Sequence, residues 1–195
     1  MQTDTDAAQG ASAHAAQGAG ADAAQGADLD AAVRAHVDRQ AVADVLVRYF
    51  RGIDAADTDL AVSEFASDAI AEVMTGKVVE GRDRIGRALG RILVRYERTS
   101  HHVTNVLVDL DGDRAVCSAY VYAFHRMKDT GATWHLWARI REDLRRDGGR
   151  WVVVAHRLYG VDSVPQREDI PAAWYVHPAD VPGERAVGRV DADRR

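Results

Sequence analysis

The sequence predicts an α+β fold in which one curved antiparallel sheet wraps over a few N-terminal helices. Two observations favour it. Helical periodicity is confined to the first half of the chain, and long alternating strands joined by tight turns fill the second half. Such a sheet, with helices across its open side, leaves a concave pocket of the kind that binds small molecules.

We expect one folded domain over residues 29–177, flanked by two tails. Residues 1–28 contain an eight-residue Ala/Gln/Gly repeat without a large apolar side chain. This segment cannot bury a core, so it is predicted to be disordered. Residues 178–195 are predicted to be loosely ordered.

The first helix is expected over residues 30–53. Its apolar side chains recur at the i, i+3, i+4 spacing of a single helix face. They are Val42, Val45, Leu46, Tyr49, Phe50 and Ile53. Asp54 lies four residues after Phe50, and therefore at the end of this buried stripe.

Shorter elements follow the first helix. A second helix, capped by Asp57 or Thr58, is expected over residues 60–68. A hairpin that turns at residues 75–76 comes next. A third helix begins near Arg82, and its expected apolar face carries Ile85, Leu89, Ile92 and Tyr96.

Long strands dominate the rest of the chain. They are expected over residues 102–110, 115–127, 133–144 and 151–161. Adjacent strand residues point to opposite faces, and Trp134 and Trp137 are an odd number of residues apart. One of these two rings should therefore line the cavity, and the other should form a dimer or surface contact.

Composition argues against several classes of protein. The net charge is -5 and no basic stripe is present, which does not suggest nucleic-acid binding. No apolar run reaches the roughly 18 residues of a membrane helix, and no secretory signal is apparent, so we expect a cytoplasmic protein. The single cysteine, Cys117, cannot form an internal disulfide and is expected to be a small buried side chain.

The chain resembles the SnoaL-like branch of the NTF2-like superfamily, a cone-shaped α+β fold, over roughly residues 31–165. The segments that carry the resemblance are AVADVLVRYFRGIDAADTDLAVSEFASDA, GRDRIGRAL, HHVTNVLVDLDGDRA and GGRWVVVAHRL. The superfamily includes scytalone dehydratase, bile-acid 7α-dehydratase, a hexachlorocyclohexane dehydrochlorinase, polyketide cyclases, isomerases and members without known activity. Fold alone therefore does not determine function.

The resemblance implies an Asp–His dyad. Asp54 in RGIDAAD matches the acid at the end of the first helix, and His101 in HHVTN matches the histidine that opens a strand. His102 should then face the other way, towards solvent. Each dyad residue also has a purely structural interpretation: a helix-ending carboxylate in water, and a core or pocket histidine without catalysis.

Three helper residues are implied by the same resemblance. Tyr49 lies one turn or so before the acid, His125 lies on the next strand, and Arg157 lies on the last strand. The dehydrochlorinase has a lysine near the position of Tyr49, and its absence here counts against dehydrohalogenation. Aromatic residues are the candidates for the pocket wall and the adjoining core: Phe50, Phe65, Trp134 and Trp137.

These residues are typical of a lyase or isomerase that needs no cofactor and no metal. Such a reaction begins with removal of a proton from carbon, and histidine is suited to this because its ordinary pKa is about 6.5. A carboxylate fixes the tautomer of the base, and a tyrosine, an arginine or a second histidine can donate to the leaving oxygen. A metal site of His101, His125 and His135 is not favoured, because no HExxH motif is present.

The expected ligand is a mid-sized, mostly apolar metabolite such as a polyketide, a steroid or an aromatic compound. Two non-catalytic functions stay open: a small-molecule-binding or dimerisation module, and an accessory subunit like the small subunit of ring-hydroxylating dioxygenases. A homodimer is expected by analogy with the family. Hydrogen-bond contact between Asp54 and His101 would favour catalysis, and a purely apolar pocket would favour binding.

Overall fold

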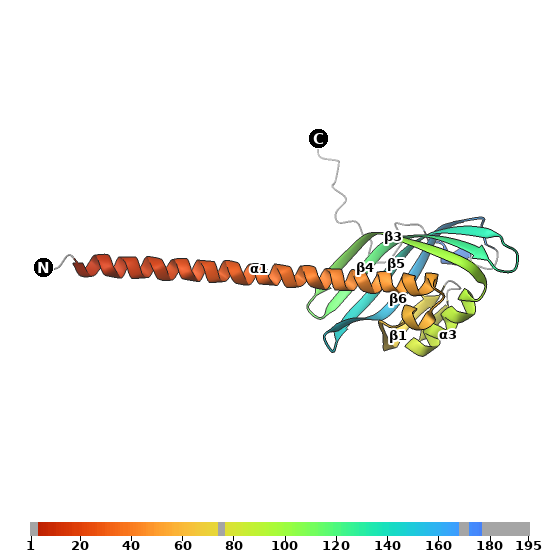
Figure 1. Cartoon of the computed structure of the whole chain (residues 1–195), viewed down its shortest axis with the longest axis horizontal. Coiled ribbons are helices and arrows are strands. Elements are labelled where there is room, and N and C mark those ends of the chain that lie inside the picture. The colour runs from red at the N-terminus through yellow and green to blue at the C-terminus, as the bar shows by residue number, and fades with distance from the viewer. Residues whose placement is uncertain (1–3, 74–76, 168–171, 177–195) are drawn as a thin grey trace, which may run out of the picture. The chain divides into compact units, whose positions relative to one another are not determined.

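A computed structural model describes residues 4–73, 77–167 and 172–176. Its elements are α1 (Asp4–Asp54), α2 (Thr58–Ala61), β1 (Phe65–Val73), β2 (Lys77–Glu80), α3 (Arg82–Leu93), β3 (Tyr96–Asp111), β4 (Arg114–Met127), β5 (Thr133–Asp147), β6 (Arg150–Val164) and η1 (Ala172–Trp174) (Figure 1). The chain divides into two compact units, residues 1–40 and residues 41–195.

Helix α1 begins at Asp4 and not at residue 30, so it includes the repeat for which the sequence predicts disorder. Alanine has the highest helix propensity, and an alanine-rich segment can form a helix without burying a core. Leu29 and Val33, on the described part of this helix, are more than half exposed. The domain boundary at residue 29 stays a prediction, and the predicted C-terminal tail lies outside the described residues.

The strands of the second unit form one six-stranded sheet in the order β2-β1-β6-β5-β4-β3. The predicted α+β class is therefore confirmed. The antiparallel meander is correct for β3 to β6, whose neighbours pair antiparallel. It is wrong for the whole sheet, because β1 pairs parallel with β6. A parallel pair needs a long crossover, and here the chain between β1 and β6 supplies it.

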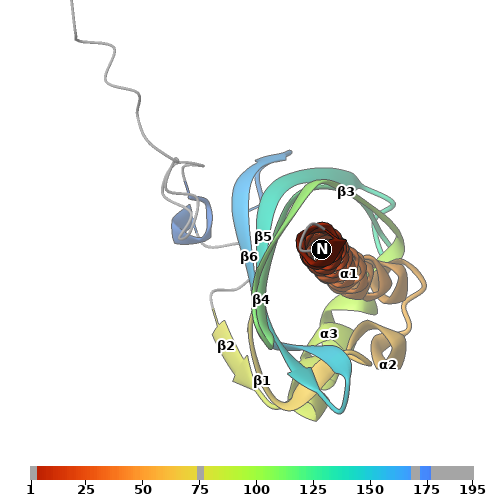
Figure 2. The same cartoon turned by 90° about the vertical axis from the view of Figure 1, so that its left-hand side faces the viewer.

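The sheet curves around the last turns of α1, with α2 and α3 on the same side (Figure 2). Alternate residues of β4 are buried from Ala115 to Met127, as a strand with one covered face requires. The predicted apolar face of the first helix is buried in the same core cluster. The core therefore lies inside the curve of the sheet.

The structure corrects two predicted elements. The second helix ends at Ala61, and the chain from Phe65 onward is strand β1. Asp57 caps this short helix as predicted, since its Oδ1 accepts a hydrogen bond from the Leu60 N–H at 2.9 Å. Tyr96 begins β3 and does not extend the third helix. The predicted turn at residues 75–76 lies outside the described residues.

Candidate active site

The end of α1 and the middle of β3 bring an acid and an imidazole together. His101 Nδ1 lies 2.6 Å from Asp54 Oδ1. The backbone N–H of His101 donates to Asp54 Oδ2 at 2.9 Å, and the Thr99 hydroxyl donates to Oδ1 at 2.7 Å. Three donors from one strand therefore hold the carboxylate that ends the helix, and the structure brings the two proposed dyad residues into contact.

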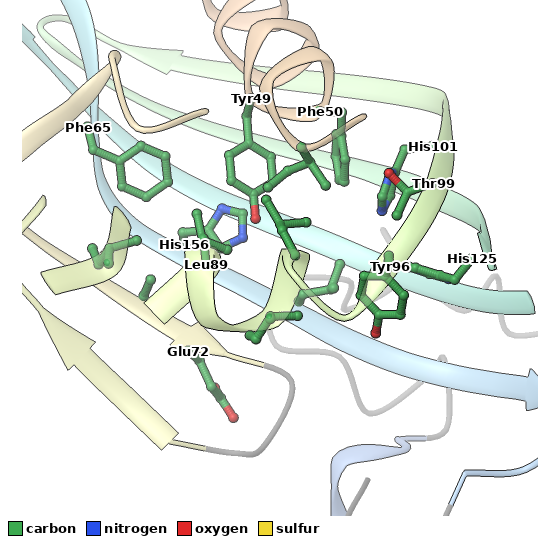
Figure 3. A pocket seen from close by; sticks show the side chains of 16 residues that line it. Tyr49, Phe50, Phe65, Glu72, Leu89, Tyr96, Thr99, His101, His125 and His156 are labelled. Carbon is green, nitrogen blue, oxygen red and sulfur yellow. The ribbon is translucent and has the colours of Figure 1, made fainter. Parts of the chain in front are cut away.

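The imidazole of His101 contacts Asp54 through Nδ1, which leaves Nε2 available to a ligand in the pocket that His101 lines (Figure 3). The side chain is 9% exposed, against 31% for Asp54. The Phe50 ring stacks on His101 with 4.9 Å between ring centroids. When the carboxylate accepts from Nδ1–H, Nε2 carries the lone pair. His102 is exposed, as the alternation along the strand predicts.

We expect Asp54 to stabilise the fold above about pH 4. Burial alone would raise the pKa of this carboxyl, but hydrogen bonds from His101 and Thr99 outweigh it and lower the pKa to about 2. This lies below the unfolded value of about 3.9, so the contribution is complete above that value and is lost as the pH falls towards the folded pKa. In urea unfolding, Asp54→Asn should cost roughly 1 kcal/mol at pH 6, allowing for solvent screening, and less near pH 3. An equal cost at both pH values would contradict this.

His125 lies beside the dyad but is kept neutral. Its ring is stacked on Trp134, with 3.9 Å between centroids, and is perpendicular to His101 at 5.4 Å. Burial, and next the charge of protonated His101, lower the pKa of His125 to about 3. A neutral imidazole can donate a hydrogen bond but cannot supply the proton of an imidazolium. Trp134 is buried and stacks on His125, but it is not among the residues that line this pocket, and neither is Trp137.

Tyr49 projects from α1 into the pocket between Phe50 and His156 (Figure 3). Its ring centroid lies 4.6 Å from that of His156. Burial, and next the charge of Glu142, raise the pKa of Tyr49 well above its usual value. The phenol therefore stays protonated and can act as a hydrogen-bond donor in the pocket.

Arg157 and Trp137 lie on the other face of the sheet, so the structure does not bring these two candidates to the pocket. Arg157 instead pairs with Asp143 at 3.0 Å, and Trp137 is 42% exposed. Arg157 faces away from the pocket because of a register shift between β5 and β6, where Asp143 pairs with Ala155 but Leu144 pairs with Val153. The extra residue on β6 reverses the alternation and turns the neighbouring His156 inward.

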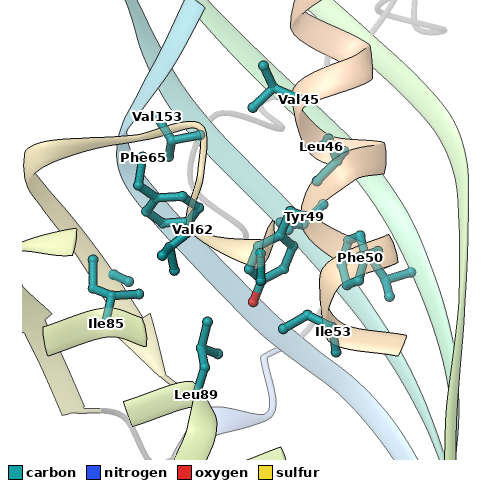
Figure 4. Close-up of a cluster of buried hydrophobic side chains, with 14 of the residues drawn as sticks. Val45, Leu46, Tyr49, Phe50, Ile53, Val62, Phe65, Ile85, Leu89 and Val153 are labelled. Carbon is teal, nitrogen blue, oxygen red and sulfur yellow. The ribbon is translucent and has the colours of Figure 1, made fainter. Parts of the chain in front are cut away.

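The pocket lies between α1, α3 and the sheet and has a volume of about 70 Å³. It is lined by polar and aromatic residues that include Tyr49, Phe50, Phe65, Tyr96, Thr99, His101, His125 and His156. Apolar side chains such as Ile53, Ile85 and Leu89 complete the wall, which is continuous with the core (Figure 4). A cavity of this size suits a compact ligand better than a steroid or a polyketide.

A second acid–imidazole pair lies at this pocket and was not anticipated from the sequence. His156 Nδ1 is 3.0 Å from Glu142 Oε1, and the two residues are opposite each other in the β5–β6 register. One signal was available: Glu142 continues the buried series of Trp134 to Ile140, so a carboxylate occupies a predicted core position. Such a residue needs a partner in the core.

Within the part of the chain that the structure describes, no three His, Cys, Asp or Glu side chains gather as a metal site. His135, considered with the metal ligands above, lies 2.7 Å from the Tyr122 hydroxyl instead. Among the same residues, no helix is both long and apolar enough to cross a membrane.

A curved sheet closed by helices over a small pocket defines the class of NTF2-like α+β proteins. Within this class the chain belongs to the SnoaL-like domain family, which matches residues 34–157. Comparison with curated proteins finds no match.

Several solved structures share the fold at low identity. A candidate scytalone dehydratase from Novosphingobium aromaticivorans is 20% identical, with a TM-score of 0.62 over 67% of this chain and 89% of its own. A candidate dehydratase of the NTF2-like family from Streptomyces avermitilis is 15% identical, with a TM-score of 0.60 over 65% and 97% of the two chains. The hexachlorocyclohexane dehydrochlorinase LinA-type3 from Novosphingobium barchaimii is 15% identical, with a TM-score of 0.62 over 72% and 93%.

Proposed function

We propose that the protein is a cofactor-independent lyase or isomerase of the dehydratase type, acting on a compact, mostly apolar metabolite. The observation that carries the proposal is the 2.6 Å contact between His101 Nδ1 and Asp54 Oδ1, with His101 lining a largely apolar pocket. A base held in this way is suited to removing a proton from carbon next to an activating carbonyl.

The polar residues at and beside the pocket have separate roles in this proposal. His101 Nε2 takes the proton, and Asp54 orients the ring and stabilises the imidazolium that forms. Tyr49 and neutral His125 donate hydrogen bonds to oxygen atoms of the substrate as negative charge develops on them. Thr99 positions the carboxylate of Asp54 through its 2.7 Å hydrogen bond.

The alternative is a small-molecule-binding module with the same fold. It needs the apolar pocket but not the three hydrogen bonds that orient Asp54 against His101. These contacts favour catalysis. The homodimer stays a prediction, and Trp137 and Tyr120, which are 42% and 40% exposed, are available for such a contact.

The proposal is tested with 3-hydroxycyclohexanone, a single-ring β-hydroxy ketone, in D₂O. We expect the wild-type protein to exchange the hydrogens next to the carbonyl for deuterium and to release water, giving cyclohexenone, faster than buffer alone. NMR of the small molecule follows both events. Binding of the ketone without exchange or water release would support the binding module and contradict the lyase.

A further inference from the structure

We propose that Glu142 and His156 form a second proton-handling pair in the same pocket, in which His156 protonates the oxygen that leaves the substrate. This inference rests on the proposed lyase function and adds its general acid. His156 and His101 both line the cavity (Figure 3). Each has a carboxylate behind it, at 3.0 Å and 2.6 Å respectively.

The burial of Glu142 is the first argument. Its side chain is 0% exposed, and that of His156 is 6% exposed. In the described part of the chain, Glu142 Oε2 is buried without a hydrogen-bond partner. An ionised carboxylate is costly in such a place unless a positive charge or a proton accompanies it. His156 is placed to hold that proton between the two groups.

The surroundings of the pair are the second argument. The Tyr49 and Phe65 rings lie 4.6 Å and 5.6 Å from the His156 ring. Cys117 lies opposite Glu142 in the β4–β5 register, and burial, and next the charge of Glu142, raise its pKa to about 12. The neighbouring thiol and phenol therefore stay protonated. In a protonated His156 the Nδ1 proton is shared with Glu142, and the Nε2 proton is the one that His156 can give to the pocket.

The other candidate acids are less suited to this step. His125 is neutral at physiological pH, as described above, and Arg157 is paired with Asp143 on the outer face. His156 takes the inward position because of the register shift in β6. A pair of this kind is a donor whose proton is held in a dry site until a substrate oxygen approaches.

In the proposed reaction one histidine accepts a proton from the substrate and the other donates a proton to it. The C–H bond breaks, its proton goes to His101 Nε2, and its electron pair forms the C=C bond. The C–O bond breaks, and the departing oxygen takes the Nε2 proton of the His156 imidazolium and leaves as water, while the Nδ1 proton stays between His156 and Glu142. Proton exchange with solvent returns both histidines to their starting states. The substrate class is a compact β-hydroxy carbonyl compound, with its acidic C–H at His101 and its hydroxyl at His156.

The test compares two leaving groups on one ring, because only hydroxide needs a proton to leave. We expect His156→Gln and Glu142→Gln to slow elimination from 3-hydroxycyclohexanone by about 10²-fold or more. The leaving group of 3-acetoxycyclohexanone departs as acetate, which needs no added proton. Elimination from this compound should therefore change only a few-fold in the same variants. His101→Ala should lose both reactions. Equal losses on both compounds in the His156 and Glu142 variants, or no loss on either, would overturn the role of His156.

A second measurement is independent of turnover. NMR of histidine labelled with ¹⁵N should show the Nδ1 proton of His156 in a hydrogen bond to the Glu142 carboxylate, as a strongly downfield signal that Glu142→Gln loses. Cys117→Ala, the matched control, should keep this signal. The same spectra report whether each variant is folded. If the Nδ1 proton of His156 gives the same signal in wild type and Glu142→Gln, the pair does not share a proton and the inference fails. If the wild type acts on neither ketone, the lyase proposal fails for this substrate class, and the Nδ1 signal still decides the pair.

Discussion

His101→Ala is expected to lower kcat for 3-hydroxycyclohexanone by about 10²–10⁴-fold, the usual contribution of a positioned base. Removal of the imidazole leaves the pocket and the other donors in place, so binding of the ketone should change little. His102→Ala is the matched control, because it removes the neighbouring imidazole on the exposed side of the same strand. Its turnover should equal that of the wild type.

Asp54→Asn tests the same dyad from the other side. An amide has nearly the shape of a carboxylate, but it can donate to Nδ1 and favour the wrong tautomer of His101. We expect a loss in kcat of at least about 10²-fold, with retention of the fold checked by circular dichroism. Turnover within a factor of two of wild type in both His101→Ala and Asp54→Asn would exclude the dyad as the base and would mean that another group removes the proton.

The fold was predictable because its signals are periodic and local. The i, i+3, i+4 spacing of the face that carries Tyr49 and Phe50, and the period-two alternation that carries Trp134, both correspond to buried side chains. The contact between Asp54 and His101 was anticipated for a different reason. It depends on two short segments whose resemblance to a family places a helix end against a strand.

What could not be predicted depends on pairing between strands. The register shift near Val154 adds one residue to β6 relative to β5, and the residue types around Val154 do not predict it. Strict alternation from Trp151 points Arg157 inward and His156 outward, which is the reverse of the structure. The parallel contact of β1 with β6 is a similar case, since it joins segments far apart in the chain and has no turn signal.

The second large effect concerns stability and the placement of Asp54. Gly52 lies two residues before Asp54, where α1 closely approaches Ala61, the last residue of α2. A Cβ added at Gly52 would lie 2.6 Å from the Ala61 Cα and 2.8 Å from its Cβ, and would also collide with the Ala61 backbone nitrogen. Backbone atoms cannot change rotamer to relieve such a collision as a flexible side chain can. The last turns of α1 and α2 would therefore have to move apart.

Two opposing effects decide the outcome of Gly52→Ala. Replacing glycine by alanine within a helix gains about 1 kcal/mol from helix propensity, whereas overpacking typically costs about 1–3 kcal/mol. Since the collision is with backbone, we expect a cost near the upper end, and a net loss of about 2 kcal/mol in the free energy of unfolding. Displacement of the last turn of α1 should also lengthen the contact between Asp54 and His101 and reduce kcat.

Gly86→Ala in α3 isolates the propensity effect for comparison. A Cβ at Gly86 would meet only the Val62 Cγ2 atom at 3.6 Å and Cγ1 at 4.0 Å, which are ordinary contacts. This variant should gain about 0.5–1 kcal/mol. Urea unfolding of wild type, Gly52→Ala and Gly86→Ala should therefore give opposite signs for the two variants. A Gly52→Ala protein as stable as Gly86→Ala would mean that α1 does not press on Ala61, and the close packing that brings Asp54 to His101 would then need another cause.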